Sequence, residues 1–204
     1  PAEVIRGQFR GYRNEPGISP TSTVETYAAL RIEIRSWRWQ GVPFFIRAGK
    51  LLPLNRGEVV VTLHRPPPIF GGPLPHTVGA IPGANYIRFR LGPDQAIALG
   101  AMVKHPGEEL AGDPVELLAS HQSEADEPDA YEQLLGDALR GETFRFARED
   151  YVEEAWRIVD PVLKAAPPLF PYEPGTWGPR EAEALVAPER WHDPAPAHGP
   201  PGTS

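Results

Sequence analysis

Hydrophobic and polar residues alternate along the first part of the chain. Between 26 and 39, in TYAALRIEIRSWRW, apolar residues occupy every second position from Ala28 to Ile34, and the other face carries Tyr27 and the charged residues Arg31, Glu33 and Arg35. A repeat of two predicts a β-strand, because a helix would need apolar residues three and four apart. One solvated face, which would include Tyr27, is typical of an antiparallel sheet.

Other stretches share the alternation or the β-branched and aromatic composition of strands. Turn residues such as Gly41 and Gly92 separate them. We expect strands at Val4–Phe9, Pro43–Arg47, Glu58–Arg65, Tyr86–Leu91 and Ala96–His105. The Gly/Pro-rich segment from Ile69 to Ala84 is expected to be a loop.

Helical spacing replaces the alternation from Pro128 onward. In PDAYEQLLGDALRG, apolar residues recur three and four apart, and Gly141 marks the end of the predicted helix. The segment EDYVEEAWRIVDPVLKAA predicts a second helix, which Pro161 should kink or interrupt. A third, short helix is expected in PREAEALVA, with Pro179 in its first turn.

The order of these elements, strands first and helices second, predicts the fold class α+β. We expect a large, mainly antiparallel sheet with helices following it in sequence, and no alternating βαβ units. One domain should cover residues 1–187. The Pro-rich remainder, residues 188–204, is expected to be a disordered tail.

Composition narrows the class of protein. With 204 residues, 41% hydrophobic and 23% charged, the chain suits one sizeable core in a soluble globular protein. The absence of cysteine excludes disulfides and thiolate chemistry, and it suits a cytoplasmic enzyme. A net charge of -7 disfavours nucleic acid as a partner, since phosphate backbones need a basic face. No apolar run approaches the roughly 20 residues of a membrane span.

Most catalytic patterns are missing from the sequence. No serine stands in a Gly-x-Ser-x-Gly turn and no two histidines lie four positions apart, so neither a serine nucleophile nor a metal site is predicted. No Gly-x-Gly-x-x-Gly motif or P-loop occurs, which leaves the chain without a recognisable dinucleotide-binding fold. The chain begins at Pro1 in strand-like sequence, so we expect it to be part of a longer protein.

The stretch PFFIRAGK places two cations at the end of an apolar strand. Arg47, Lys50 and the nearby Arg56 could together hold a phosphate dianion, and Gly49 would let a ligand approach the backbone. Charged residues also protect strand ends against aggregation, so the pattern alone leaves both interpretations open.

The order of several motifs resembles the C-terminal domain of glucose-6-phosphate dehydrogenase. The stretch RGQFRGYRNEPGISPTSTVETYAALRIEIRSWRWQGVPFFIRAGKLLP is similar to the start of that domain. Four later segments follow in the family's order, namely NYIRFRLGPDQAIALG, PDAYEQLLGDALRG, YVEEAWRIVDPVL and PYEPGTWGPREAEAL. The resemblance covers Val4 to about Ala187.

The resemblance implies an activity and a division of labour. Family members oxidise glucose 6-phosphate at C1 with NADP, giving the 6-phosphogluconolactone of the oxidative pentose phosphate pathway. Their N-terminal dinucleotide-binding domain carries the catalytic histidine, its aspartate partner and the coenzyme's Gly-rich loop. Their C-terminal domain binds substrate and forms a homodimer through its sheet. This chain would therefore be the substrate-binding and dimerisation half of a cytoplasmic oxidoreductase, with no catalytic residue, and inactive alone.

The resemblance also implies substrate-binding residues. Lys50 matches the family lysine that binds and orients the sugar phosphate between the two domains. A second family cation corresponds to Asn55 here, with Arg56 directly after it. The sequence leaves open whether Asn55 or Arg56 fills that position.

Some family members bind a second, structural NADP in this domain. Arg47, Arg56 and Arg90 match cationic positions of that site. Ala98 and Gly100 stand where those members have a tyrosine and a lysine, and Trp177 stands where they have an arginine. Losing two cations and a stacking ring should remove most of the binding energy. We therefore expect the structural site to be absent, and NADP to be bound mainly by the N-terminal domain.

Two other interpretations stay open. The chain could be a stand-alone interaction module that dimerises or pairs with a full-length relative. Trp37 and Trp39, on one side of their predicted strand, would then supply the contact surface, as large aromatic residues often do. A free-standing sugar phosphate binder is disfavoured, because half a pocket lacks most of the polar contacts that fix a ligand.

Overall fold

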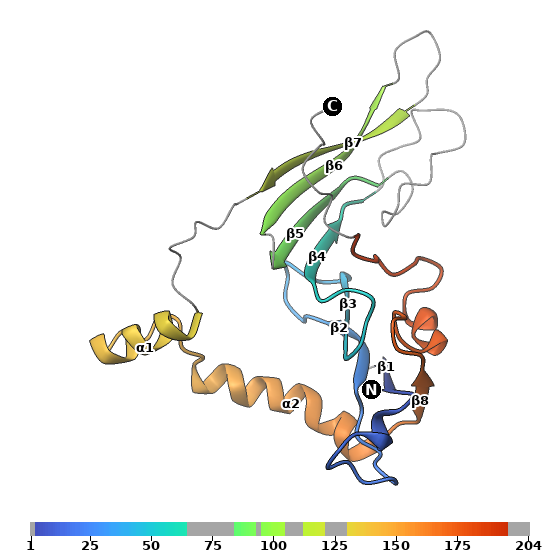
Figure 1. The fold of residues 1–204 in the computed structure, drawn as a ribbon. Coiled ribbons are helices and arrows are strands. Elements are labelled where there is room, and N and C mark those ends of the chain that lie inside the picture. Colours follow the sequence, from blue (N-terminus) through green and yellow to red (C-terminus); the bar gives the residue numbers. More distant parts are fainter. Residues whose placement is uncertain (1–2, 65–83, 93–94, 105–111, 121–129, 196–204) are drawn as a thin grey trace, which may run out of the picture.

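The computed structural model describes residues 3–64, 84–92, 95–104, 112–120 and 130–195. Its first sheet has four strands, β1 (Glu3–Phe9), β2 (Tyr27–Glu33), β3 (Pro43–Gly49) and β8 (Leu169–Tyr172). They lie in the order β3-β2-β1-β8 (Figure 1). The pairs β2–β3 and β1–β2 are antiparallel, while β8 returns from the far end of the chain to pair with β1 in parallel.

The second sheet also has four strands, and each pairs with its neighbour in the sequence. They are β4 (Gly57–Thr62), β5 (Tyr86–Gly92), β6 (Ala96–Lys104) and β7 (Gly112–Ser120). All three pairings are antiparallel. The predicted fold class is confirmed, with the large sheet present as two four-stranded sheets. Strands β7 and β8 were not predicted.

The helices follow the second sheet in sequence. They are α1 (Ala130–Arg140), α2 (Glu149–Ala165) and a short 3-10 helix, η2 (Arg180–Leu185), with another 3-10 turn, η1 (Tyr12–Asn14), after β1. Gly141 has a φ of 72°, the left-handed conformation that ends α1 as predicted. Helix α2 continues through Pro161, so of the two predicted effects, a kink or an interruption, the interruption does not occur. None of the helices in the described ranges is long and apolar enough to cross a membrane.

The core of the first sheet lies on the face of β2 that the sequence predicted to be solvated. Tyr27 is 2% exposed and Ala29 is 0% exposed. The Tyr172 ring packs against Tyr27 with centroids 5.5 Å apart, and Ala182 of η2 joins the same cluster. The predicted solvation of Tyr27 is therefore wrong, because the Tyr172 side chain and Ala182 of η2 pack against that face.

Strand β2 is shorter than predicted. It ends at Glu33, and successive turns follow, in which Trp39 N–H donates to the Ser36 carbonyl and Val42 N–H to that of Trp39. Trp37 is fully exposed, and the Trp39 ring packs edge-on against Phe44, 5.3 Å away. The interaction-module interpretation required the two tryptophans to share one strand face, and they do not.

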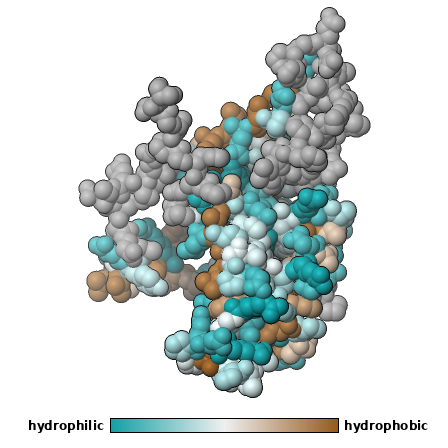
Figure 2. Space-filling model, turned by 45° about the vertical axis from the view of Figure 1, so that its right-hand side comes forward, coloured by the Kyte–Doolittle hydropathy of each residue, from teal (hydrophilic) through white to brown (hydrophobic). Residues whose placement is uncertain are grey.

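The second sheet has two chemically different faces, because paired residues of neighbouring strands point to the same side. One face carries the rows Val61–Ile87–Leu99–Leu117 and Val59–Phe89–Ile97–Ala119, which we call the apolar face. The opposite face carries Glu58, Arg88 and Arg90, as the alternation in Tyr86–Leu91 predicted. Leu117 on the apolar face is 70% exposed. Figure 2 shows hydrophobic residues (brown) reaching the surface in several places.

Candidate functional site

Lys50 follows directly on the last residue of β3, on a backbone that is fixed from two sides. Its N–H donates to the Thr26 carbonyl at 2.8 Å. Its own carbonyl accepts from the Tyr172 hydroxyl at 2.8 Å. The side chain is exposed, and no carboxylate in the described part of the chain pairs with its ammonium group. Lys50 therefore offers an unneutralised positive charge from a rigid position.

The backbone on both sides of Lys50 is tightly constrained. A Cβ on Gly49 would lie 2.7 Å from the Tyr27 ring, so packing already requires glycine there, and the approach of a ligand to this backbone stays a prediction. Leu51 has a φ of 53°, which costs a non-glycine residue roughly 1 kcal/mol or more. Its carbonyl accepts from the Gly175 N–H at 2.8 Å, which holds this conformation in place.

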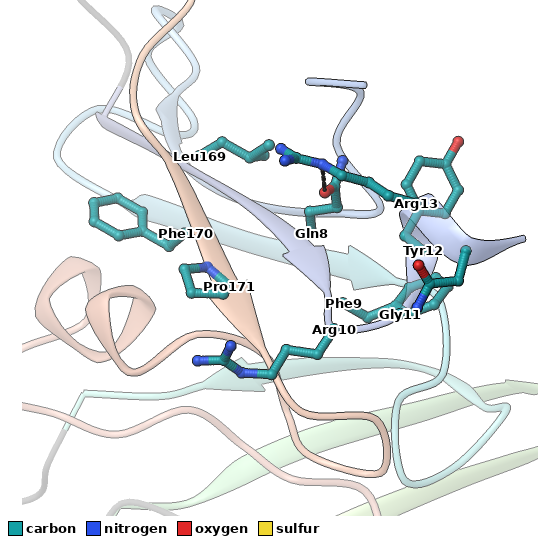
Figure 3. A pocket seen from close by; sticks show the side chains of 10 residues that line it. Gln8, Phe9, Arg10, Gly11, Tyr12, Arg13, Leu169, Phe170 and Pro171 are labelled. Carbon is teal, nitrogen blue, oxygen red and sulfur yellow. Dashed lines mark hydrogen bonds between the residues drawn. The ribbon is translucent and has the colours of Figure 1, made fainter. Parts of the chain in front are cut away.

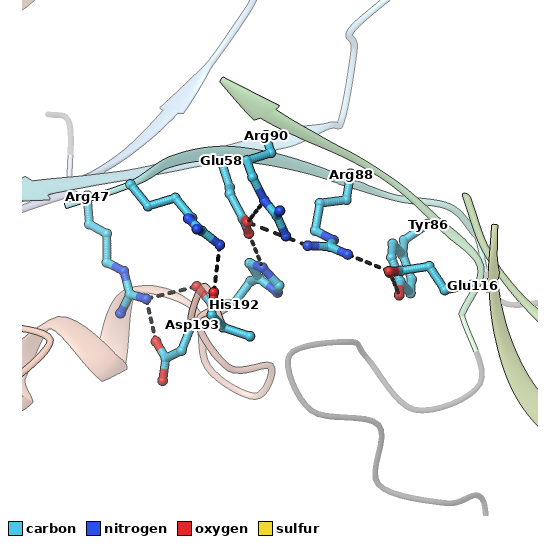
Figure 4. A network of polar contacts seen from close by, with 10 residues as sticks. Arg47, Glu58, Tyr86, Arg88, Arg90, Glu116, His192 and Asp193 are labelled. Carbon is cyan, nitrogen blue, oxygen red and sulfur yellow. Dashed lines mark hydrogen bonds and ion pairs between the residues drawn. The ribbon is translucent and has the colours of Figure 1, made fainter. Parts of the chain in front are cut away.

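Arg47, on β3, is engaged by the C-terminal segment of the chain. Its guanidinium lies over two indole rings, 4.6 Å from the centroid of Trp177 and 5.0 Å from that of Trp191. It donates to the His192 carbonyl at 2.8 Å and forms an ion pair with Asp193 (Figure 4). The Arg47 side chain is only 9% exposed. This cation therefore already has its anion and its stacking partners within the chain.

Arg56 lies at the other end of the loop that carries Lys50, and it also contacts the C-terminal segment. Its Nη1 donates to the Ala195 carbonyl at 2.8 Å. Asn55, the alternative candidate, has an exposed side chain. The predicted cluster of three cations is therefore divided: Arg47 and Arg56 hold the chain's own C-terminal segment, while Lys50 faces solvent.

Glu58 is the centre of a buried network of charges on β4 and β5. Its carboxylate is 2% exposed and lies 3.2 Å from Arg90 Nε, 3.5 Å from Arg88 Nη1 and 2.9 Å from His192 Nε2 (Figure 4). Burial alone would raise the pKa of Glu58, but the hydrogen bonds from His192 and Arg90 and the charge of Arg88 outweigh it and lower the pKa. Arg88 also pairs with Glu116 at 2.5 Å.

The residues that complete this network from the C-terminal side, His192 and Asp193, were missed by the sequence reasoning. They lie in the segment 188–204 that was expected to be a disordered tail, whereas residues 191–195 contact both sheets through Arg47 and Glu58. A tryptophan at position 191, within a Pro-rich stretch, was the one signal that this segment packs. The domain boundary near residue 187 stays a prediction.

A separate hollow of about 350 Å³ lies where β1 and η1 meet β8 (Figure 3). Its cations are already engaged, since Arg13 Nε donates to Gln8 Oε1 at 3.0 Å and Arg10 pairs with Glu173 at 2.6 Å. Its lining comes from residues 8–14 and 169–171 and includes none of the predicted substrate-binding residues. In the described ranges, no three His, Asp or Glu side chains gather as metal ligands.

Comparison with known proteins identifies most of the chain with one domain family. The model of the glucose-6-phosphate dehydrogenase C-terminal domain matches residues 1–192. Glucose-6-phosphate 1-dehydrogenase of Aggregatibacter actinomycetemcomitans is 39% identical over 191 residues, which is 91% of this chain and 37% of that protein. Glucose-6-phosphate 1-dehydrogenase 1 of Mycobacterium tuberculosis is 39% identical over 196 residues, 95% of this chain and 41% of that protein.

Solved structures give the same result. The crystal structure of glucose-6-phosphate 1-dehydrogenase from Mycobacterium avium is 42% identical, with a TM-score of 0.80 over 96% of this chain and 41% of that one. A glucose-6-phosphate dehydrogenase solved in complex with its substrate glucose 6-phosphate is 26% identical, with a TM-score of 0.73 over 94% of this chain and 41% of that one. The chain thus spans about two fifths of the length of each of these relatives.

Proposed function

Since the chain belongs to the glucose-6-phosphate dehydrogenase family, an oxidoreductase family whose C-terminal domain it matches, we propose that it is the substrate-binding and dimerisation half of such an enzyme. The complete enzyme would oxidise glucose 6-phosphate to 6-phosphogluconolactone with NADP in the cytoplasm, in the oxidative pentose phosphate pathway. The observation that carries the proposal is Lys50, an exposed cation with no carboxylate partner among the described residues, on a constrained turn at the end of an apolar strand.

Lys50 would bind and orient the sugar phosphate. A charge-assisted hydrogen bond from an ammonium group to a phosphate contributes roughly 1.5–3 kcal/mol. The fixed backbone of Lys50 would limit the entropy lost when its side chain meets the substrate. Asn55 and Arg56 are the two candidates for a second substrate contact, with Asn55 exposed and Arg56 bound to the Ala195 carbonyl.

The proton abstraction and the binding of NADP would belong to an N-terminal dinucleotide-binding domain. Of the histidines within the described ranges, His192 is held by Glu58 in the charge network, so it is a poor candidate for a base near Lys50. The family resemblance supports a catalytic histidine and a Gly-rich loop in a preceding domain. We therefore propose that this chain holds no catalytic residue and is inactive alone.

The residues of this chain do not fit a second, structural NADP. Arg47 is neutralised by Asp193, and Arg90 is neutralised by Glu58. The ring of Tyr86 fills the space over Gly100, where an added Cβ would lie 2.1 Å from a ring carbon. A polyanion would have to displace these groups before it could bind, which supports the proposal that the structural site is absent.

The homodimer would form through the apolar face of the second sheet. Ile97 and Leu99 on its inner strand β6 are 53% and 44% exposed, and a face of this kind is typical of an interaction surface. The same face suits the alternative interaction module, which would pair with a full-length relative. Leu99→Asp should halve the mass of the assembly in sedimentation experiments, and an unchanged mass would exclude this face as the interface.

The activity is tested with the native assembly that contains this chain, purified from its own cells. It should reduce NADP with glucose 6-phosphate and much more slowly with glucose, which lacks the phosphate that Lys50 would bind. The isolated 204-residue chain should give no NADPH. An assembly without activity on glucose 6-phosphate would contradict the proposed reaction. Steady turnover by the isolated chain would contradict the proposed division of labour.

A further inference from the structure

The loop that carries Lys50 is held at both ends by the same short segment of the chain. At its start, Arg47 donates to the His192 carbonyl and pairs with Asp193. At its end, Arg56 donates to the Ala195 carbonyl at 2.8 Å. The segment Trp191–Ala195 therefore bridges the two ends of the Lys50 loop from one side.

The bridging segment is itself anchored to both sheets. Trp191 donates from Nε1 to the Ala182 carbonyl at 2.9 Å and packs edge-on against Phe45 of β3, with ring centroids 6.2 Å apart. His192 meets the buried Glu58 of β4 at 2.9 Å. Figure 4 shows His192 between Glu58 on one side and Arg47 with Asp193 on the other. The bridging segment is far from the loop in sequence, so it can fix the loop only once the domain has folded.

We propose that residues Trp191–Ala195 form a strap that positions Lys50 for the sugar phosphate. The proposal rests on the proposed function, in that it needs Lys50 to bind substrate. The strap residues touch no reacting group themselves; they act by fixing the two arginines that bound the loop. Without the strap, Arg47 has no carboxylate partner in the described ranges. Because a buried, unpaired charge is unfavourable, its side chain, now 9% exposed, would move into solvent. The end of β3 and the turn at Lys50 would loosen with it.

The most direct test compares two truncations. One ends after Glu189 and removes the strap, and the other ends after Ala195 and keeps it. Trypsin can cut after Arg47, Lys50 and Arg56, so the rate of cleavage at these bonds reports the order of the loop without any reference to activity. In the native assembly, we expect the strap deletion to speed cleavage there about tenfold and the matched truncation to leave it unchanged. Equal cleavage rates in the two truncations would overturn the strap.

A point variant guards against a deletion that fails to fold. Asp193→Asn removes the charge that pairs with Arg47, and Asp193→Glu restores it. We expect Asp193→Asn to raise the KM for glucose 6-phosphate about fivefold while the KM for NADP stays the same, and Asp193→Glu to recover most of the loss. Circular dichroism monitors folding in each variant. A parallel loss of affinity for both substrates would indicate a merely structural role and would overturn the proposal.

The two readouts separate the strap from the function it rests on. Faster cleavage together with a higher KM for glucose 6-phosphate supports both. Faster cleavage at an unchanged KM overturns the strap as the element that positions Lys50, and Lys50→Ala then tests the proposed substrate contact separately. An unchanged cleavage rate overturns the strap, whatever the KM.

Discussion

The Nε2 atom of His192 lies 2.9 Å from a carboxylate oxygen of Glu58, although 134 positions separate the two residues in the sequence. Because Glu58 is 2% exposed and also meets Arg88 and Arg90, this contact joins the C-terminal segment to the charged face of the second sheet. The same segment reaches β3 of the first sheet through Arg47. The polar network of Figure 4 is therefore the place where the two sheets and the end of the chain are connected.

Glu58→Gln should destabilise the domain strongly. The variant leaves Arg90, only 13% exposed, without its carboxylate, and we expect a loss of roughly 2–3 kcal/mol in the free energy of unfolding. Glu154→Gln is the matched control, because the Glu154–Arg157 pair on α2 is 54% and 71% exposed. That control should leave the free energy of unfolding nearly unchanged in urea titrations. Equal losses would contradict the central role of Glu58.

The stability that Glu58 contributes should depend on pH in the acidic range. Since its pKa is lower in the folded than in the unfolded state, the contribution is fully present above the unfolded value of about 4.5. It is lost as pH falls through the folded pKa, where the carboxylate facing Arg88, Arg90 and His192 is protonated. The free-energy gap between the wild type and Glu58→Gln should shrink from about pH 6 to pH 3. A gap independent of pH would contradict this account.

Two neighbouring tyrosines should respond in opposite ways to removal of the hydroxyl. The Tyr172 hydroxyl bonds the carbonyls of Lys50 and Thr26, so Tyr172→Phe should cost roughly 1–3 kcal/mol of folding free energy. The buried Tyr27 hydroxyl has no hydrogen-bond partner among the described residues, and burial raises the pKa of Tyr27 to about 12. Tyr27→Phe should therefore be neutral or stabilising by up to about 1 kcal/mol. Equal losses in thermal unfolding of the two variants would contradict the assignment.

Alanine variants at the two glycines of the GTWGP motif distinguish the cost of backbone strain from the cost of steric overlap. Gly175 has a φ of 78° with open space around an added Cβ, whereas a Cβ on Gly178, at a φ of 106°, would lie 2.3 Å from the Tyr27 ring. Gly175→Ala should cost about 1 kcal/mol from conformation alone. Gly178→Ala should cost about 1–3 kcal/mol more, because Tyr27 is packed in the core. Chemical denaturation that ranks the two variants the other way would contradict this packing.

Local sequence patterns predicted correctly which side of a strand is charged and which is apolar where both kinds of residue alternate within that strand. The strand at Tyr86–Leu91 and its two faces were predicted correctly, because its charged and apolar residues alternate along the chain. The buried face of β2 was predicted wrongly. The residues that pack against Tyr27 and Ala29 are Tyr172 and Ala182, which lie far away in the sequence. Periodicity can show that one face is buried, but not which distant segment will cover it.

The candidate site was predictable to a similar extent. The cation at Lys50 was visible as a charge after an apolar strand, and the family resemblance gave it a role. The partners of Arg47 were not visible, because Asp193 lies 146 positions away in a Pro-rich stretch. A Pro-rich composition disfavours helices and sheets, but it does not prevent an extended segment from packing through a tryptophan and a few polar contacts.

The central claim, that Lys50 binds the sugar phosphate, is tested most directly by steady-state kinetics of Lys50→Ala in the native assembly. Lys164→Ala on α2 serves as the control, because that lysine is 77% exposed and pairs only with Asp160 in the described ranges. We predict that Lys50→Ala raises the KM for glucose 6-phosphate about 10- to 100-fold at an unchanged KM for NADP, while the control matches the wild type. An unchanged KM for glucose 6-phosphate in Lys50→Ala would contradict the account.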